Sequence, residues 1–245
     1  MIRRAMVLAA GFGTRLRPVT LTVPKALVPV ADTPFVEHLL ALLHAGGVRE
    51  VVINLHHLGD VIERHIGDGA RFGLAVRYSP EPTILDTAGG IKQAEALLAG
   101  EPFLVANADS LLEVSLRELG EFHRARGGIA TLALRADPDA ARYGLVEVDA
   151  DDRVRRIVGR PDGVVGSGLR GLMFPGLHVL EPAVFAHMAS GRAASITRET
   201  YPSLLAKGLP IFGFETTARW INIDTPAAVE AADRELRTRP AKAPL

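Results

Sequence analysis

The chain has 245 residues, enough for one large domain with a sizeable core. Its 28 basic and 28 acidic side chains balance, so no overall positive field favours nucleic acid or an anionic membrane as a partner. Cysteine is absent, which excludes disulfides, thiolate catalysis and cysteine zinc sites. No apolar stretch reaches the ~20 residues of a membrane span, and we expect a cytoplasmic protein.

The first half of the chain alternates between two kinds of predicted element. Short apolar or β-branched runs predict strands, and apolar residues at helical spacing predict helices. In chain order we predict a strand at 6–10, a helix at 34–47, a strand at 48–55, a helix at 58–66, a strand at 74–78, a helix at 87–98 and a strand at 103–106. This alternation predicts an α/β fold, with a mostly parallel, doubly wound, Rossmann-like sheet that carries helices on both faces.

The pattern changes after about residue 130 and predicts a small β-rich lobe. The predicted elements are a hairpin-like pair at 143–149 and 154–158, a strand region at 169–180, and helices at 198–207 and 226–236. We expect a single domain over residues 1–237, with one half at about 1–130 and the other at about 131–237. Residues 238–245 are expected to form a frayed tail.

A glycine-rich loop directly follows the first predicted strand. Residues 8–18 read Leu-Ala-Ala-Gly-Phe-Gly-Thr-Arg-Leu-Arg-Pro. Glycines here let backbone N–H groups approach a phosphate chain, and Arg15 and Arg17 can neutralise its charge. The loop lacks the Gly-Lys-Ser/Thr of a P-loop and the third glycine of a dinucleotide fingerprint, which disfavours a nicotinamide-dependent dehydrogenase.

A single lysine follows the loop between two prolines. Pro24 and Pro29 stiffen the backbone on either side of Lys25, which lowers the entropy lost when the lysine is held against a ligand. The alternative interpretation is a solvated loop lysine, the usual environment of this residue type.

Residues 8–30 resemble the signature of the sugar-nucleotide pyrophosphorylases, also called the nucleotidyl transferase family. That signature is Leu-Ala-Gly/Ala-Gly-x-Gly-Thr-Arg-Leu-x-Pro-x-Thr followed by Pro-Lys-x-Leu-x-Pro-Val, and every fixed element is present. Within this family the sequence most resembles mannose-1-phosphate guanylyltransferases and N-acetylmuramate-1-phosphate uridylyltransferases. The resemblance continues through segments 71–73, 78–81, 86–91, 107–109, 143–147, 174–180 and 220–226.

The resemblance implies a sugar-1-phosphate nucleotidyltransferase that uses Mg²⁺. Such an enzyme transfers a nucleoside monophosphate from a nucleoside triphosphate to a sugar 1-phosphate and releases pyrophosphate. The half at 1–130 would bind the nucleotide and the half at 131–237 the sugar phosphate, with the β-rich lobe as the sugar-binding part. The implied catalytic residues are Arg15, Lys25 and Asp109. The implied nucleotide-binding residues are Leu8, Ala9, Ala10, Gly11, Gly13, Thr14, Arg15, Thr87, Gly89, Gly90 and Asn107. The implied sugar-phosphate contacts are Lys25, Tyr143, Gly144, Arg160 and Gly176.

Three residues are candidate ligands for Mg²⁺. Asp109 follows a predicted strand, at the edge where open α/β sheets bind ligands, and its carboxylate suits a hard cation. The second ligand in the family is the aspartate of Trp-x-Asp-Ile/Val-Gly-Thr-Pro. Here Asn222 stands at that aspartate position and Asp224 at the glycine position. Asp224 either supplies the missing carboxylate or only caps the following helix.

Other departures from the family pattern leave alternatives open. The segment Asp86-Thr87-Ala88-Gly89-Gly90 stands where the family usually has Leu-Gly-Thr-Ala/Gly-Gly, and the family's Glu-Lys-Pro sugar contact appears as Gly-Arg-Pro at 159–161. Glu81 is interpreted as a solvated loop residue rather than a contact to the base. The alternatives are a cytidylyl- or uridylyltransferase that acts on a non-sugar phosphate, and a non-catalytic regulatory subunit that binds a sugar nucleotide. The sequence names neither base nor sugar, and it leaves a homo-oligomer open.

Overall fold

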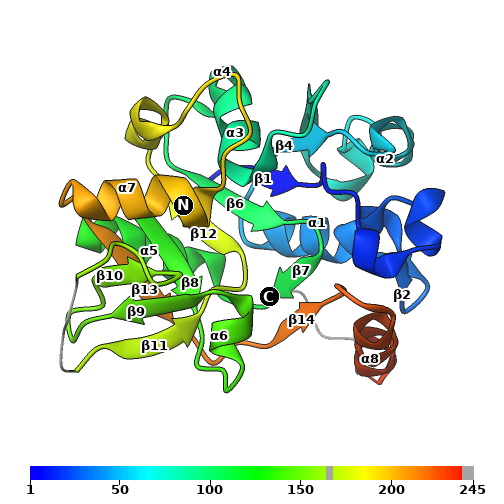
Figure 1. Ribbon diagram of the computed structural model, residues 1–245. Helices are drawn as coiled ribbons and strands as arrows, with labels where there is room; N and C mark the ends of the chain where they lie inside the picture. The colour runs from blue at the N-terminus through cyan, green and yellow to red at the C-terminus, as the bar shows by residue number, and fades with distance from the viewer. Residues whose placement is uncertain (164–167, 239–245) are drawn as a thin grey trace.

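A seven-stranded sheet forms the centre of the computed structural model, which describes residues 1–163 and 168–238 (Figure 1). The strand order is β13-β8-β12-β6-β1-β4-β5. β12 is antiparallel to both of its neighbours, whereas all the other pairings in this sheet are parallel. The predicted mostly parallel α/β sheet is therefore confirmed. Its strands are β1 (Arg4–Leu8), β4 (Glu50–Leu55), β5 (Ala75–Pro80), β6 (Phe103–Asn107), β8 (Ala130–Leu134), β12 (Leu177–Leu180) and β13 (Ile211–Glu215).

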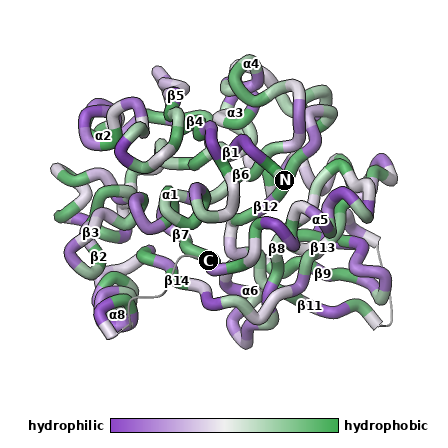
Figure 2. Tube along the Cα trace, turned by 180° about the vertical axis from the view of Figure 1, so that it is seen from behind, coloured by the Kyte–Doolittle hydropathy of each residue, from purple (hydrophilic) through white to green (hydrophobic). Residues whose placement is uncertain are grey.

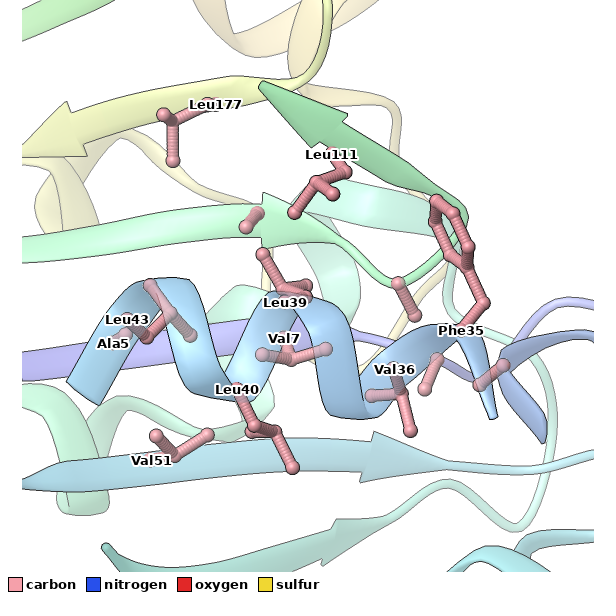
Figure 3. Close-up of a cluster of buried hydrophobic side chains, with 14 of the residues drawn as sticks. Ala5, Val7, Phe35, Val36, Leu39, Leu40, Leu43, Val51, Leu111 and Leu177 are labelled. Carbon is pink, nitrogen blue, oxygen red and sulfur yellow. The ribbon is translucent and has the colours of Figure 1, made fainter. Parts of the chain in front are cut away.

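Helices cover both faces of this sheet because successive residues of a buried strand point to opposite sides. Ala5 and Val7 of β1 belong to one hydrophobic core and Met6 belongs to the other. Figure 3 shows the first core, in which α1 packs its leucines against β1 and β4. The helices are α1 (Phe35–Ala45), α2 (Gly59–Ile66), α3 (Asp86–Gln93), α4 (Glu95–Leu98), α5 (Leu116–Arg126), α6 (Ala140–Tyr143), α7 (Tyr201–Ala206) and α8 (Pro226–Arg237).

The two cores contain different helices. The first core takes side chains from α1, α2, α5 and α8, and the second takes them from α3, α4 and α7. On α8 the buried residues are Ala232 and Leu236, and hydrophobic and hydrophilic residues are mixed along the helix (Figure 2). No helix in the described part of the chain is both long and apolar enough to cross a membrane.

A second, smaller sheet lies beside the main sheet (Figure 1). It contains β9 (Leu145–Val148) between β10 (Val154–Ile157) and β11 (Arg170–Met173), with antiparallel pairing throughout. The predicted hairpin and β-rich lobe correspond to this sheet. Two further pairs are short: β2 (Pro29–Val30) with β3 (Thr33–Pro34), and β7 (Ser110–Leu112) with β14 (Trp220–Asn222).

The boundary near residue 130 does not divide the main sheet. β8, β12 and β13 all lie beyond that boundary and join the strands of the first half. The predicted strand region at 169–180 is two strands, because Pro175 and Gly176 turn the chain and Gly176 has φ 93°. The helix predicted at 198–207 begins as a π-helical turn over Ile196–Thr200 and continues as α7. Most of the predicted tail at 238–245 lies outside the described residues.

Short 3-10 helices fill several connections. They span Thr14–Leu16, Val19–Leu21, Lys25–Leu27, Ala70–Phe72 and Pro182–His187. The first three follow β1 in quick succession, so the segment between β1 and β2 is a compact series of turns at the carboxyl end of the sheet.

Candidate active site

The carboxyl ends of two neighbouring strands define the candidate site. β1 and β6 are adjacent and parallel, with Leu8 opposite Asn107. The backbone N–H of Ala108 donates a hydrogen bond to the carbonyl oxygen of Leu8 (3.0 Å). The glycine loop after β1 and Asp109 after β6 therefore meet at one edge of the sheet, where open α/β folds bind ligands.

The glycine loop is held in place by its own backbone. Gly13 adopts φ 60°, and a Cβ on it would come within 2.9 Å of Thr20. The Thr20 hydroxyl donates a hydrogen bond to the carbonyl oxygen of Gly13 (2.8 Å). A Cβ on Gly11 would have no heavy atom within 4 Å, so the loop is open to a ligand there. Glycine is needed at Gly13 for conformation, whereas Gly11 leaves the backbone accessible.

Charged side chains from three distant segments converge beside this loop. The Lys25 ammonium contacts one carboxylate oxygen of Asp109 and one of Asp224. The Arg15 guanidinium lies 3.0 Å from the other oxygen of Asp224. The Lys25 side chain is only 14% exposed, and that of Asp224 15%. Lys25 is therefore not the solvated loop lysine of the alternative interpretation, because two carboxylates hold it.

These cations keep Asp224 ionised. Burial by itself would raise the pKa of the Asp224 carboxyl, because it disfavours the charged form. The hydrogen bond from Lys25 and the positive charges of Lys25 and Arg15 outweigh burial, so the pKa lies below its ordinary value. Asp224 is accordingly an anion at neutral pH.

Asn222 and Thr225 determine the local geometry around Asp224. The backbone N–H of Asp224 donates a hydrogen bond to the side-chain oxygen of Asn222 (2.9 Å). The N-cap of α8 is Thr225, whose hydroxyl oxygen accepts a hydrogen bond from the N–H of Ala228 (3.2 Å). Asp224 is therefore not the helix cap, and its carboxylate is available to the charged cluster.

A cleft of about 250 Å³ opens on the same edge of the sheet. It is lined by Leu8, Ala10, Gly11, Asn54, Glu81, Ile84, Asp86, Thr87, Asn107 and Asp109. A smaller hollow of about 50 Å³ shares Leu8, Gly11 and Asp109 with the cleft and extends to Lys25. Asp109 therefore borders both the cleft and the hollow that contains Lys25 of the charged cluster.

Asn54 and Glu81 form a buried polar connection under the cleft, which the sequence did not indicate. Glu81 is 4% exposed, so the expectation of a solvated loop residue is wrong. The Asn54 amide donates to one Glu81 carboxylate oxygen (2.7 Å), and the N–H of Leu85 donates to the other (2.8 Å). The side-chain oxygen of Asn54 accepts from the N–H of Ala9 (2.8 Å). The glycine loop is thereby linked to the far wall of the cleft.

The residues at the start of α3 have different roles in the structure. Asp86 lines the cleft and has φ 56°, a left-handed conformation in which glycine is unstrained. Thr87 lines the cleft, and its hydroxyl accepts from the N–H of Ile196 (2.8 Å). A Cβ on Gly89 would lie 2.6 Å from the Arg192 carbonyl oxygen. One on Gly90 would lie 2.5 Å from the Glu81 carboxylate. Internal packing therefore requires both of these glycines.

Four predicted sugar-side residues lie on the side of the small sheet and β14. The Tyr143 ring packs edge-on against Trp220, with centroids 5.1 Å apart. The Trp220 indole N–H donates to the Ser110 hydroxyl (2.8 Å), next to Asp109. Gly144 has φ 104°, and a Cβ on Gly176 would collide with Asn107. Arg160 is exposed, and none of its contacts within the described residues reaches the cleft or the charged cluster.

The donor set fits a hard divalent cation. Among the described residues no group of three or more His, Asp or Glu side chains forms a ready-made metal centre. Asp109 and Asp224 nevertheless contact the same ammonium nitrogen, so their oxygens lie within reach of a single cation. Mg²⁺ commonly takes one or two protein carboxylates and completes its coordination with water and substrate phosphates. Two convergent carboxylates beside an open cleft match that requirement.

Comparison with known proteins agrees with this geometry. Residues 4–239 match the family model described as nucleotidyl transferase. A UTP–glucose-1-phosphate uridylyltransferase of Synechocystis sp. is 32% identical over 233 residues, which are 90% of this chain and 60% of that protein. A mannose-1-phosphate guanylyltransferase of Mycobacterium tuberculosis is 34% identical over 223 residues, which are 91% of this chain and 61% of that protein. The chain thus spans about three fifths of the length of these curated relatives.

A solved structure has the same fold. HddC from Yersinia pseudotuberculosis, complexed with GMP-PN, superposes with a TM-score of 0.79 at 24% identity. The match covers 96% of this chain and 100% of that one. The family model spans nearly the whole chain, and its signature residues lie around the cleft and the charged cluster. The chain therefore belongs to the nucleotidyl transferase family.

Proposed function

We propose that this protein transfers a nucleoside monophosphate from a nucleoside triphosphate to a sugar 1-phosphate, which yields a nucleotide-sugar and pyrophosphate. The observation that carries the proposal is the convergence of Arg15, Lys25, Asp109 and Asp224 at one end of an open cleft. Two reacting polyanions need such a site, because cations must screen their mutual repulsion while carboxylates hold a metal ion. The names of the curated relatives, a uridylyltransferase and a guanylyltransferase of sugar 1-phosphates, support the same reaction class.

The nucleotide would lie along the cleft. Its base and ribose would occupy the end lined by Ile84, Asp86 and Thr87, away from the charged cluster. Its phosphates would lie over the glycine loop, where Gly11 leaves the backbone open. Arg15 is 64% exposed beside Asp224 and would bind the pyrophosphate that leaves.

The sugar phosphate would enter from the side of β14 and the small sheet. Lys25 would contact its phosphate, and Tyr143, Gly144 and Gly176 would border the sugar. The Tyr143 ring lies against Trp220, and Trp220 is tied to the residue next to Asp109. This arrangement supports a sugar site adjacent to the phosphates. Arg160 belongs to the proposed sugar side only through the family pattern.

The reaction is an in-line displacement at the α-phosphorus. An oxygen of the sugar phosphate forms a new bond to that phosphorus, and the bond to the oxygen that bridges the α- and β-phosphates breaks. Pyrophosphate leaves with the electron pair. The attacking oxygen is already an anion, so the chain needs no general base and contributes alignment and charge. Asp109 and Asp224 would hold Mg²⁺, which polarises the α-phosphate when bound.

The non-catalytic alternative rested on the asparagine at position 222 and on the absent family glutamate. The carboxylate of Asp224 contacts Lys25 and is ionised. Together with Asp109 it gives the cluster two carboxylates, although the side chain of Asn222 is a neutral amide. This observation favours an enzyme over a binding subunit. The acceptor class, sugar phosphate or another phosphate, is decided by the experiment below.

The test is pyrophosphate release from the five common nucleoside triphosphates, each with a panel of sugar 1-phosphates and phosphocholine, in the presence of Mg²⁺. We expect turnover with at least one sugar 1-phosphate, and a nucleotide-sugar of the corresponding mass as product. Asp109→Asn serves as the inactive control. Turnover with phosphocholine and with none of the sugar 1-phosphates would show that the acceptor is a non-sugar phosphate. Tight nucleotide binding with no turnover on any pair would identify a binding subunit and end the enzymatic proposal.

A further inference from the structure

The ammonium of Lys25 occupies the position between the two carboxylates where a metal ion would be held. It contacts Asp109 and Asp224 together, and its side chain is 14% exposed. We infer that Lys25 is the resident cation of this pair, and that a divalent cation displaces it and sends its ammonium to the bound phosphates. The inference rests on the proposed function for the identity of the cation and of the phosphates.

Charge balance supports displacement rather than addition. Two carboxylates, Asp109 and Asp224, face two cations, Lys25 and Arg15, so the cluster is neutral as it stands. A divalent cation placed beside the lysine would meet a positive charge within contact distance, in a partly buried site where screening is weak. Departure of the ammonium leaves both carboxylates to the metal ion and removes that repulsion.

The local structure permits the lysine to move alone. Lys25 begins the 3-10 helix Lys25–Leu27, and its neighbours Ala26 and Leu27 are buried. The backbone is therefore fixed while the side chain keeps its four rotatable bonds. The hollow of about 50 Å³ lined by Lys25, Gly11 and Asp109 opens toward the glycine loop. A rotation within that hollow carries the ammonium from the carboxylates toward the place proposed for the phosphates.

Displacement would couple two binding events through one side chain. Without the metal ion, Lys25 is engaged by carboxylates and is not available to a phosphate. With the metal ion, the same ammonium becomes a phosphate ligand. The metal ion and the substrate phosphates should therefore bind with positive cooperativity that disappears when the lysine is removed.

The first experiment measures binding of Mn²⁺ or Mg²⁺ alone by calorimetry, without nucleotide. The proteins are the wild type, Lys25→Met and Arg17→Met. Arg17 carries the same charge in the same loop but makes no contact with either carboxylate, so it controls for general electrostatics. We expect Lys25→Met to bind the metal ion about tenfold or more tightly than wild type, within the range common for coupled sites. Arg17→Met should stay within about threefold of wild type.

Equal or weaker metal binding by Lys25→Met would overturn the inference, because a displaced competitor must weaken wild-type binding. Equal gains in Lys25→Met and Arg17→Met would also overturn it, since the effect would then be general charge. Absence of metal binding in all three proteins would do the same. None of these results bears on pyrophosphate release, which tests the proposed function separately.

The second experiment follows the lysine itself. Chemical acetylation of Lys25, quantified by mass spectrometry, reports how accessible its amine is to the reagent. We expect the rate at Lys25 to rise about fivefold or more when Mg²⁺ is added, because the side chain leaves its two carboxylates. Lys207, which lies on the exposed surface near His187, is the internal control and should not change. An unchanged rate at Lys25 in saturating Mg²⁺ would show that the lysine stays in place.

Discussion

The side-chain oxygen of Asn222 accepts a hydrogen bond from the backbone N–H of Asp224, 2.9 Å away, in the turn between β14 and α8. Through this bond the residue at the family's aspartate position orients the residue that carries the carboxylate. The carboxylate of this chain therefore lies two residues after the family's aspartate position, at Asp224, and it contacts Lys25 and Arg15.

Asp224→Asn should raise the Mg²⁺ concentration needed for half-maximal turnover and lower the maximal rate by about 10² or more, because one of two anionic ligands is lost. A Mg²⁺ titration of pyrophosphate release measures both effects. Asn222→Asp should leave activity similar. Thr225→Ala is the matched control: it removes the helix cap, costs about 1 kcal/mol of stability and leaves the metal requirement unchanged. An unaltered Mg²⁺ requirement in Asp224→Asn would assign the metal to Asp109 alone.

Arg15→Ala should lower turnover by about 10² or more, roughly 2.7 kcal/mol of activation free energy, because a charge contact to the leaving group is lost. The Arg15 side chain is 64% exposed, so the melting temperature should hardly change. Arg17→Ala in the same loop is the comparison, with a smaller effect on rate. Steady-state kinetics with thermal unfolding of the three proteins checks this, and normal turnover in Arg15→Ala would remove Arg15 from the mechanism.

Glu81→Gln should destabilise the fold by about 1–3 kcal/mol, because the new amide cannot accept from both Asn54 and the Leu85 N–H. Chemical denaturation measures the loss. Nucleotide binding should weaken as well, since Asn54 also holds the N–H of Ala9 in the glycine loop. Glu121→Gln, on the exposed face of α5, is the control and should change little. Equal stabilities of these two variants would contradict the role of the buried connection.

Acidification should destabilise the folded chain below about pH 6.5. Burial lowers the pKa of His178 from 6.5 to about 3. Burial also lowers the pKa of His123, although the Glu181 carboxylate opposes it. The unfolded chain takes up these protons at higher pH than the folded chain does. Stability is therefore complete above pH 6.5 and is lost as the pH falls, by up to about 1.4 kcal/mol per pH unit for each histidine.

Urea unfolding at several pH values between 7.5 and 4.5 measures this slope. His178→Gln should keep a hydrogen-bonding partner for Tyr201 and remove one titrating group, so its slope should be shallower by about one proton. A variant slope equal to that of the wild type would show that His178 titrates alike in both states.

Much of the fold followed from local pattern. In the first 106 residues, the strands of the main sheet and the helices α1 and α2 lie within a few residues of their predicted positions, because each has a clear apolar pattern. The helix predicted at 87–98 is two helices, α3 and α4, and the short strands β2 and β3 were not predicted. α5 was not predicted, because its buried stripe of Leu116, Leu119, Gly120 and His123 contains only two strongly apolar residues. β8 reads Ala-Thr-Leu-Ala-Leu, which has little β-branched character, and its burial comes from β12 and β13 on either side.

The sequence motifs indicated some residues of the candidate site, and the remaining residues meet only through the tertiary fold. The resemblance implies Arg15, Lys25 and Asp109 as catalytic residues. In the structure Lys25 contacts Asp109, and Arg15 joins them through Asp224. The choice between ligand and cap for Asp224 depends on a hydroxyl one residue away, and no spacing rule separates the two. Asn54 and Glu81 are 27 residues apart, and they meet because Asn54 lies near the end of β4 and Glu81 directly follows β5, the strand paired with β4. Such contacts depend on tertiary structure and leave no local pattern.

The hydrogen bonds from Ala9 through Asn54 to Glu81 limit which residues can change when nucleobase specificity changes within the family. A change at Glu81 would alter both the loop proposed to hold the phosphates and the wall proposed to face the base, so we expect mutation there to change specificity and rate together. Ile84 and Asp86 line the same wall but are exposed and stand outside that connection. We therefore expect family members that use different nucleobases to differ at the positions of Ile84 and Asp86 and to keep those of Asn54 and Glu81. Engineering of a new base specificity should likewise change Ile84 and Asp86.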